Sequence, residues 1–124
     1  MKAFGVALGV VLAAAAASTA FAQDAVAGAG TFKSFCGACH SLARPMQNLQ
    51  GPSLIGVVGR RAGTAPGFRY SAALKAYGKT WTPEGLDAYL ANPKAVAPKG
   101  TMNFRGLADA RKRADVVAFL AQQK

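Results

Sequence analysis

The sequence predicts an all-α domain of about four helices joined by long loops. Apolar side chains recur at helical spacing in separate short segments, and several segments begin with a residue that favours a helix N-terminus. No segment alternates apolar and polar residues as a half-buried strand would, and glycine and proline interrupt the connections. The apolar side chains are too few to fill the space between such helices, so we expect a large apolar ligand to complete the core.

The first helix is expected from about Ala25 to Cys36, because Asp24 is a good N-cap and apolar residues follow at roughly helical spacing. Gly28 lies in the middle of this helix, where glycine lowers helix propensity. We therefore expect Gly28 to permit a close crossing with another helix. The apolar residues of this helix are Val26, Ala29, Phe32 and Phe35.

Two stretches, 41–67 and 94–106, lack helical or alternating periodicity and are rich in glycine and proline. A loop of the first length inside a compact domain usually encloses something functional. Between the two stretches, Ser71 caps a short helix that ends at Tyr77, before a glycine.

The last two helices have clear boundaries. Thr82-Pro83-Glu84 combines a cap, a first-turn proline and an acid near the positive helix end, and the helix it begins stops at Asn92-Pro93. A final helix is expected from about 109 to 122. The apolar residues expected to be buried in these two helices are Leu86, Tyr89, Leu90, Val116, Val117, Phe119 and Leu120.

The N-terminus has the composition of an export signal. Lys2 precedes an apolar run that finishes with Ala20-Phe21-Ala22, the small-x-small pattern that a signal peptidase reads. We expect a cleaved signal peptide over residues 1–22 and one mature periplasmic domain over residues 23–124. The alternative is an uncleaved membrane anchor formed by residues 3–22, which is just long enough to span a bilayer.

The mature domain is strongly basic. Without Lys2, 14 basic side chains stand against 5 acidic ones, a formal net charge of +9. This charge favours acidic partners. Nucleic acid is not expected, because the protein is exported, its basic residues are scattered and it has no aromatic-basic recognition motif.

The two cysteines lie in one motif, Cys36-Gly37-Ala38-Cys39-His40. A disulfide across two intervening residues would close a tiny loop and constrain little of the unfolded chain. Cys-x-x-Cys-His is the attachment signature of c-type haem. Its spacing lets two thiols reach the vinyl groups along one porphyrin edge while the adjoining imidazole of His40 meets the iron.

Other uses of this motif fit the sequence less well. A structural zinc site wants four Cys or His ligands, and the chain has three because His40 is its only histidine. A thioredoxin-like redox pair would accompany a βαβ pattern, which is absent.

The second axial ligand of the iron is expected to be a methionine. A thioether stabilises ferrous iron and raises the reduction potential. Met46 lies only six residues past His40 and would have to double back around the ring, so a gap-filling role suits it better. Met102 lies in an irregular loop far along the chain, which can approach the opposite face. A vacant or otherwise occupied position is the alternative.

From Gly28 to Leu120 the chain resembles class I cytochrome c, especially the mitochondrial members and their soluble bacterial relatives. The resemblance implies a small helical fold with long loops wrapped around one covalent haem. Gly28, Phe32 and Phe119 match the residues at which the family's N-terminal and C-terminal helices cross.

The resemblance also implies roles for residues around the haem. The Pro52 carbonyl would accept a hydrogen bond from the iron ligand His40, a contact that controls ligand basicity. Tyr89 would pack beside the methionine ligand, and Phe104 would lie near the exposed haem edge. The residues that would bond or neutralise the haem propionates are Arg60, Tyr70 and Trp81.

Three features depart from the family pattern. The ligand loop reads Pro98-Lys99-Gly100-Thr101-Met102, where the family commonly has Pro-Gly-Thr-Lys-Met. Leu74 occupies the position of a buried asparagine. Of the lysines that surround the haem edge in mitochondrial members, Lys94 is matched. Other family lysine positions hold Phe35, Leu49, Thr101, Ala108 and Asp109.

The sequence therefore predicts a monomeric one-electron carrier and not an enzyme. Its expected partners are membrane redox complexes such as a cytochrome bc complex, a terminal oxidase or a photosynthetic reaction centre, met through acidic surfaces. The chief alternative is a haem protein with an open iron position, acting as a peroxidase or gas-binding sensor. A zinc or disulfide module without haem is the third possibility.

Overall fold

The computed structural model describes residues 23–124, so the predicted signal peptide lies outside the described residues. Within 23–124 the chain forms helices and loops but no strand, and its only β-type pairing is an isolated bridge between Arg61 and Thr80. The all-α prediction is confirmed, with five helices in place of about four. They are α1 (Ala25–Phe35), α2 (Ala72–Tyr77), α3 (Pro83–Ala91), α4 (Pro93–Val96) and α5 (Ala110–Ala121).

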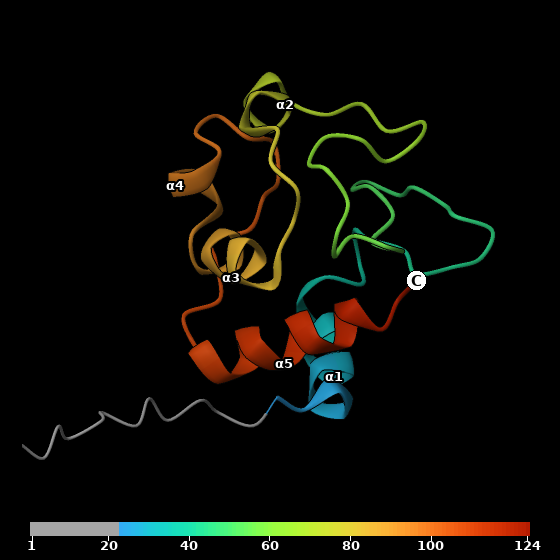
Figure 1. Cartoon of the computed structure of the whole chain (residues 1–124), viewed down its shortest axis with the longest axis vertical. Helices are drawn as coiled ribbons and strands as arrows, with labels where there is room; N and C mark the ends of the chain where they lie inside the picture. Colours follow the sequence, from blue (N-terminus) through green and yellow to red (C-terminus); the bar gives the residue numbers. More distant parts are fainter. Residues whose placement is uncertain (1–22) are drawn as a thin grey trace, which may run out of the picture.

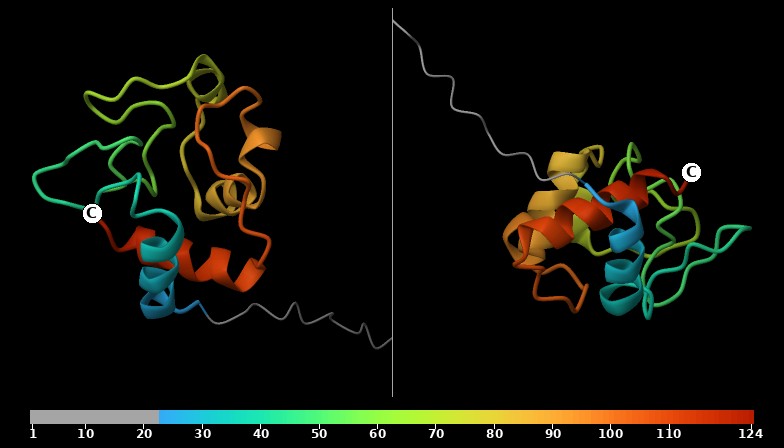
Figure 2. Two further views of the ribbon diagram at one scale, coloured as in Figure 1. Left: turned by 180° about the vertical axis from the view of Figure 1, so that it is seen from behind. Right: turned by 90° about the horizontal axis from the view of Figure 1, so that it is seen from below.

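Helices α1 and α5 cross at one end of the molecule, as the views in Figures 1 and 2 both show. The Asp24 carboxylate caps α1 by accepting hydrogen bonds from the N–H groups of Val26 and Ala27. At the crossing, a Cβ added to Gly28 would lie 2.0 Å from the Asp115 carbonyl oxygen, so only glycine fits this approach. The crossing expected at Gly28 is therefore confirmed.

The apolar residues of α1 do not form one buried face. Phe32 is buried, and its ring lies 5.7 Å from that of Phe119 on α5. Val26 and Phe35 are instead 85% and 49% exposed. The helical spacing of these side chains was thus a poor guide to burial, because contact with α5 involves only the narrow strip around Gly28 and Phe32.

Helix α4 was missed by the prediction. The Thr82 hydroxyl accepts a hydrogen bond from Gly85 and begins α3, which ends at Ala91 as expected. The Asn92 side chain then accepts from Ala95 N–H, so Asn92-Pro93 both ends α3 and begins a new helix. Proline is tolerated in a first helical turn, and four residues are too few to show a periodicity.

Arg113 connects α5 to α3 and to the segment between them. Its Nε lies 2.8 Å from Asp87 Oδ1 in an ion pair. Its Nη1 donates to the carbonyl oxygens of Leu107 and Ala108 at 2.7 and 3.0 Å. One side chain therefore fixes how α5 meets the rest of the helical layer.

The long segment between α1 and α2 folds back across the space beside the helices (Figure 1). Backbone hydrogen bonds join it to the start of α3, where Gly59 donates to Trp81 and Trp81 donates to Arg60. Gly56 also donates to Gln123 at the C-terminus. Among residues 23–124, no helix has both the length and the apolar character that crossing a membrane demands.

Candidate functional site

The loops and helices enclose a cavity of about 340 Å³. All ten residues that the sequence singled out line it. They come from the end of α1, the long segment after it, the segment between α2 and α3, α3 itself and the segment after α4: Cys36, Cys39, His40, Pro52, Arg60, Tyr70, Trp81, Tyr89, Met102 and Phe104.

The remaining wall of the cavity is mainly apolar. Leu54, Val57, Leu86, Leu90, Val116 and Leu120 all contribute to it, and several of them also belong to the hydrophobic core. Leu74, which stands where the family has an asparagine, lines the cavity as well. The sequence predicts too few apolar side chains to fill the core. The structure accordingly has an apolar cavity that is large enough for a ligand.

The cysteine motif continues from the end of α1. Cys36 N–H donates to Phe32 and His40 N–H donates to Cys36, so the chain turns tightly and brings both thiols and the imidazole to the cavity. The two cysteines are not joined to each other in a disulfide. Burial, with a smaller contribution from Cys39, raises the pKa of the Cys36 thiol to about 11, so this group is a neutral thiol at neutral pH until it is bonded to a ligand.

The orientation of His40 is fixed by its neighbours. Its Nδ1 lies 2.8 Å from the Pro52 carbonyl oxygen, to which it donates in the tautomer that leaves Nε2 with a free lone pair. Burial lowers the pKa of His40, so the ring is neutral and suited to a metal. A Cβ on Gly51 would lie 2.5 Å from His40 Cε1, so this glycine makes room for the ring.

The segment that carries Met102 has its own constraints. Lys94 Nζ donates to the Gly100 carbonyl oxygen, and Leu107 N–H donates to Leu90 at 2.7 Å. Lys99 adopts a φ of 64°, which is unusual for a residue other than glycine. Met46, by contrast, is 43% exposed and does not line the cavity, so it is neither a gap-filler nor placed as a ligand.

Arg60 supplies the positive charge of the cavity wall. Its Nη1 and Nη2 donate to the Ile55 and Ser53 carbonyl oxygens at 3.0 and 2.9 Å, so its guanidinium is held by the protein backbone. Its Nε is buried and has no hydrogen-bond partner in the described chain. Buried N–H groups are nearly always paired, so this one fits a ligand that brings an acceptor.

Aromatic rings form one wall of the cavity. Trp81 is buried, and its ring centroid lies 4.9 Å from that of Tyr89. Burial raises the pKa of Tyr89, whose phenol is therefore neutral. The Tyr70 hydroxyl accepts a hydrogen bond from Ala65 N–H at 3.0 Å. These residues serve both as core aromatics and as lining.

Two contributors were not singled out from the sequence. Gln50 lines the cavity, and the Cys39 thiol donates to its Oε1 at 3.6 Å. Gly51 contacts the His40 ring. No local pattern marks either of these roles, since they arise when Gly51 N–H pairs with the Cys39 carbonyl oxygen across the loop.

An apolar ligand that two thiols can bond, and that carries a metal for an imidazole, is a c-type haem. The residues present fit a haem. One cavity is lined by the two cysteines, the histidine, Met102 and an apolar wall. Arg60, whose buried Nε has no hydrogen-bond partner in the described chain, lines the same cavity. The fold and this cavity define a c-type cytochrome.

The chain is similar in sequence to known c-type cytochromes. The chain is 45% identical over 123 residues to cytochrome c2 of Rhodomicrobium vannielii, covering 99% of this chain and 98% of that protein. It is 47% identical over 97 residues, 78% of its length, to the cytochrome c-type cyt cy of Rhodobacter capsulatus, and spans 48% of that protein. No family model matches the sequence.

A solved structure, cytochrome cH from Methylobacterium extorquens, has a TM-score of 0.75 and 42% identity, covering 80% of this chain and 98% of that one. The chain belongs to the class I cytochromes c. It is an electron carrier with one covalent haem c, exchanges electrons with other redox proteins and is not an enzyme.

Proposed function

We propose that this chain moves single electrons between membrane redox complexes with a haem that Cys36 and Cys39 would bond through thioethers and whose iron His40 Nε2 and the Met102 sulfur would bind. The convergence of these four residues on one cavity carries the proposal. When bound, the haem supplies the ferric and ferrous states.

The chain's own residues tune and protect that site. The Pro52 carbonyl oxygen holds His40 in one tautomer and increases the basicity of Nε2. Lys94 ties the backbone two residues before Met102, which favours a ligand that stays in place in both oxidation states. The apolar wall excludes water, and Arg60, Tyr70 and Trp81 provide the polar end that the propionates need.

We also propose export to the periplasm with cleavage after Ala22, and a mature domain of residues 23–124. The small-x-small sequence before Gln23 and the cap that Asp24 provides to α1 support this boundary, because the fold begins at once after it. The expected partners are a cytochrome bc complex, a terminal oxidase or a reaction centre. The intact mass of protein recovered from the periplasm tests the boundary.

The ligand assignment is tested by the optical spectrum of protein matured in a cell that attaches haem. The ferric wild type should show the charge-transfer band of a thioether bound to iron. Met102→Ala should lose this band and have a lower reduction potential, since a thioether favours the ferrous state. Met46→Ala is the matched control and should leave both unchanged.

Three outcomes would contradict the proposal. A colourless wild-type protein would exclude the haem. A band that survives in Met102→Ala would assign the sixth position to another residue. Rapid binding of carbon monoxide or cyanide by the native protein would indicate an open iron, as in a peroxidase or sensor.

A further inference from the structure

Three aromatic side chains form a continuous stack that begins at the cavity. Tyr89 and Trp81 line the cavity, and their ring centroids are 4.9 Å apart. Trp81 also stacks on Tyr77, with the centroids 5.0 Å apart and an angle of 27° between the ring planes. Tyr77 is the last residue of α2, the helix at the end of the molecule opposite α1 (Figure 1). The stack therefore leads from the cavity to a different part of the fold.

Tyr77 is the outer end of this stack. It is half-buried and, unlike Trp81 and Tyr89, it is not part of the cavity lining. Lys79 is exposed, and its Nζ lies 5.7 Å from the centroid of the Tyr77 ring, within the range of a cation–π contact. Trp81, in the middle of the stack, is only 5% exposed. The stack thus connects the cavity to solvent through a buried indole.

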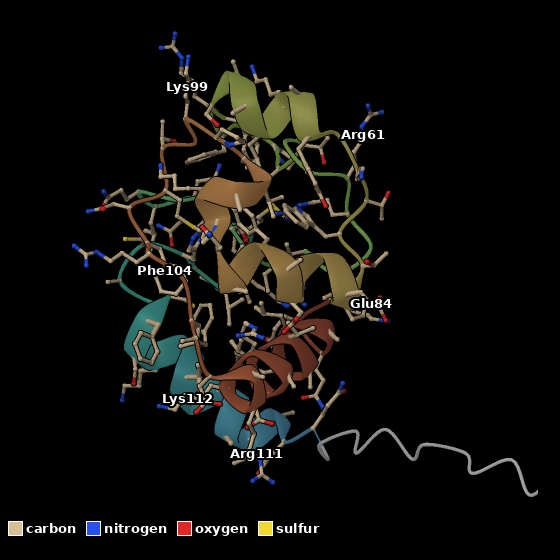
Figure 3. All side chains as sticks on the ribbon, turned by 90° about the vertical axis from the view of Figure 1, so that its left-hand side faces the viewer. Arg61, Glu84, Lys99, Phe104, Arg111 and Lys112 are labelled. Carbon is tan, nitrogen blue, oxygen red and sulfur yellow. The ribbon has the colours of Figure 1, made fainter. Side chains whose placement is uncertain are left out.

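The surface at this outer end carries more positive than negative charge. Arg61 is exposed and pairs with Thr80 in the isolated bridge, next to Lys79. The first acidic residue after α1 in the chain is Glu84, in the first turn of α3. Figure 3 shows Arg61 and Glu84 at the edge of the molecule opposite Phe104, which lines the cavity. Two cations and one carboxylate leave this surface basic.

We propose that Tyr89, Trp81 and Tyr77 form a relay that carries an oxidising equivalent, the lack of one electron, from the cavity to the surface, where a small anionic reductant restores Tyr77. The rings of tyrosine and tryptophan can lose single electrons, and electron tunnelling falls off steeply with distance, so stacked rings are the favoured route. This inference rests on the proposed function, because it needs the haem that the cavity would hold.

The relay answers a stronger oxidant than the usual partners of an electron carrier. A ferric c-type haem is too weak an oxidant to take an electron from tyrosine, so the relay is idle in ordinary electron transfer. Hydrogen peroxide, in contrast, is reduced to two water molecules by two electrons and two protons. One electron comes from the ferrous form of the loaded protein. The other comes from Tyr77, which also releases its phenolic proton, and solvent supplies the second proton.

The surroundings of the two tyrosines favour Tyr77 as the residue that stays oxidised. Tyr89 lies in a mainly apolar wall, where its phenolic proton is hard to release, and both Tyr89 and Trp81 pass the electron inward and end unchanged. Tyr77 is close to solvent, and the ammonium of Lys79 near its ring repels the departing proton. An anion such as ascorbate, attracted by Arg61 and Lys79, then returns one hydrogen atom to the phenoxyl oxygen of Tyr77.

The test locates the oxidised residue directly. Reduced, haem-loaded protein is mixed with hydrogen peroxide and the spin trap tert-nitrosobutane, and peptide mass spectrometry identifies the residue that carries the adduct. The wild type should carry it on Tyr77. Tyr77→Phe keeps the stacked ring but loses the phenol, so the adduct should move inward to Tyr89, and peroxide should bleach the haem absorption faster.

Trp81→Phe interrupts the relay and leaves Tyr77 in place, so the Tyr77 adduct should be lost. Trp81→Tyr puts an oxidisable ring back in the middle of the stack and should restore the adduct. Tyr70→Phe is the matched control, because Tyr70 also lines the cavity but contacts Phe68 instead of the stack, and it should keep the adduct on Tyr77. The optical spectrum of each variant reports whether its haem ligands are retained.

Ascorbate tests the outer end of the relay. Added ascorbate should suppress the Tyr77 adduct of the wild type. Lys79→Gln should need about threefold more ascorbate for the same suppression at low ionic strength and should match the wild type at high ionic strength. Lys112→Gln on α5 removes one charge from the other end of the molecule, as Figure 1 shows, and should need no more ascorbate than the wild type.

Three outcomes would overturn the relay. Wild-type adducts confined to Tyr70 and Tyr89 would show that the oxidising equivalent stays in the cavity. A Tyr77 adduct that persists in Trp81→Phe would show that peroxide oxidises Tyr77 from solution. Equal bleaching of the wild type and Tyr77→Phe would leave the stack as core packing alone.

The same measurements separate the relay from the proposed function. A wild type that lacks the thioether band but carries the adduct on Tyr77 fails the ligand assignment and keeps the relay. A wild type with a normal band and no adduct on Tyr77 keeps the ligand assignment and overturns the relay. A colourless protein overturns both.

Discussion

Replacing Gly28 with alanine should separate helices α1 and α5 at their crossing. The new Cβ would lie 2.0 Å from the Asp115 carbonyl oxygen, 2.5 Å from its carbonyl carbon and 2.9 Å from Phe119 Cβ. Contacts of this kind are not observed below 3.0 Å, so one helix must withdraw by about 1 Å. Both nearest atoms are backbone, so no side-chain rotation can relieve the overlap.

The magnitude follows from two opposing effects. Alanine in place of glycine inside a helix favours folding by about 1 kcal/mol. Overpacking a tight contact costs about 1 to 3 kcal/mol, and a backbone clash belongs at the upper end. We expect a net loss of roughly 2 kcal/mol in the free energy of unfolding, which lowers Tm by roughly 10 °C in a domain of this size.

Gly30→Ala is the matched control for this experiment. Gly30 lies in the same helix, two residues away, and a Cβ there would meet nothing within 4 Å. Gly30→Ala should therefore gain helix propensity without any steric clash, and should stabilise the protein by up to about 1 kcal/mol. Guanidinium unfolding of both haem-loaded variants gives the two values. Equal stabilities for the two variants would refute the reasoning.

Substitutions at three other positions test different parts of the structure. Gly51→Ala should displace the His40 ring, which a Cβ would approach to 2.5 Å, and should reduce the yield of haem-loaded protein; a normal yield and spectrum would contradict this contact. Arg113→Ala should lower the free energy of unfolding, measured with denaturant, by about 2 kcal/mol. Arg113→Lys should not restore the lost stability, because a single ammonium group lacks the guanidinium fork that reaches Asp87, Leu107 and Ala108. Lys99→Gly should stabilise the folded protein by up to about 1 kcal/mol, because glycine adopts the left-handed backbone of this position without strain. The charge-transfer band should then persist to higher temperature than in the wild type. Loss of the band at a lower temperature would contradict this prediction.

Local chemistry explains why most helix boundaries were predictable. The caps of α1, α2 and α3 are made by Asp24, Ser71 and Thr82, each bonding N–H groups within three residues along the chain. Contacts between residues this close in the chain can be predicted from the local sequence. Helix α4 was missed because its cap, Asn92, looks from the sequence like the end of α3.

Burial and the cavity wall were less predictable because they depend on residues far apart in the chain. Phe32 and Phe35 share an apolar spacing, yet only Phe32 meets α5. The motif at Cys36 identifies the ligand chemistry, and the resemblance places Pro52 beside His40, but neither indicates that the His40 ring leaves no room for a side chain at Gly51. Met102 is preferred to Met46 because of its distance along the chain and the irregular loop that carries it, and of these two methionines the structure brings Met102 to the cavity.

The tight crossing and the cavity are coupled through α5. The Asp115 carbonyl oxygen contacts the backbone at Gly28, whereas the next residue, Val116, lines the cavity together with Leu120 one turn later. Packed helices move as rigid units, so a shift of α5 at Asp115 also moves Val116 against the ligand. The glycine that allows the crossing therefore also sets one wall of the cavity, although it lies outside the cavity itself. A small domain can in this way let a ligand contribute to the core, because the helix that crosses α1 is the same helix that lines the cavity.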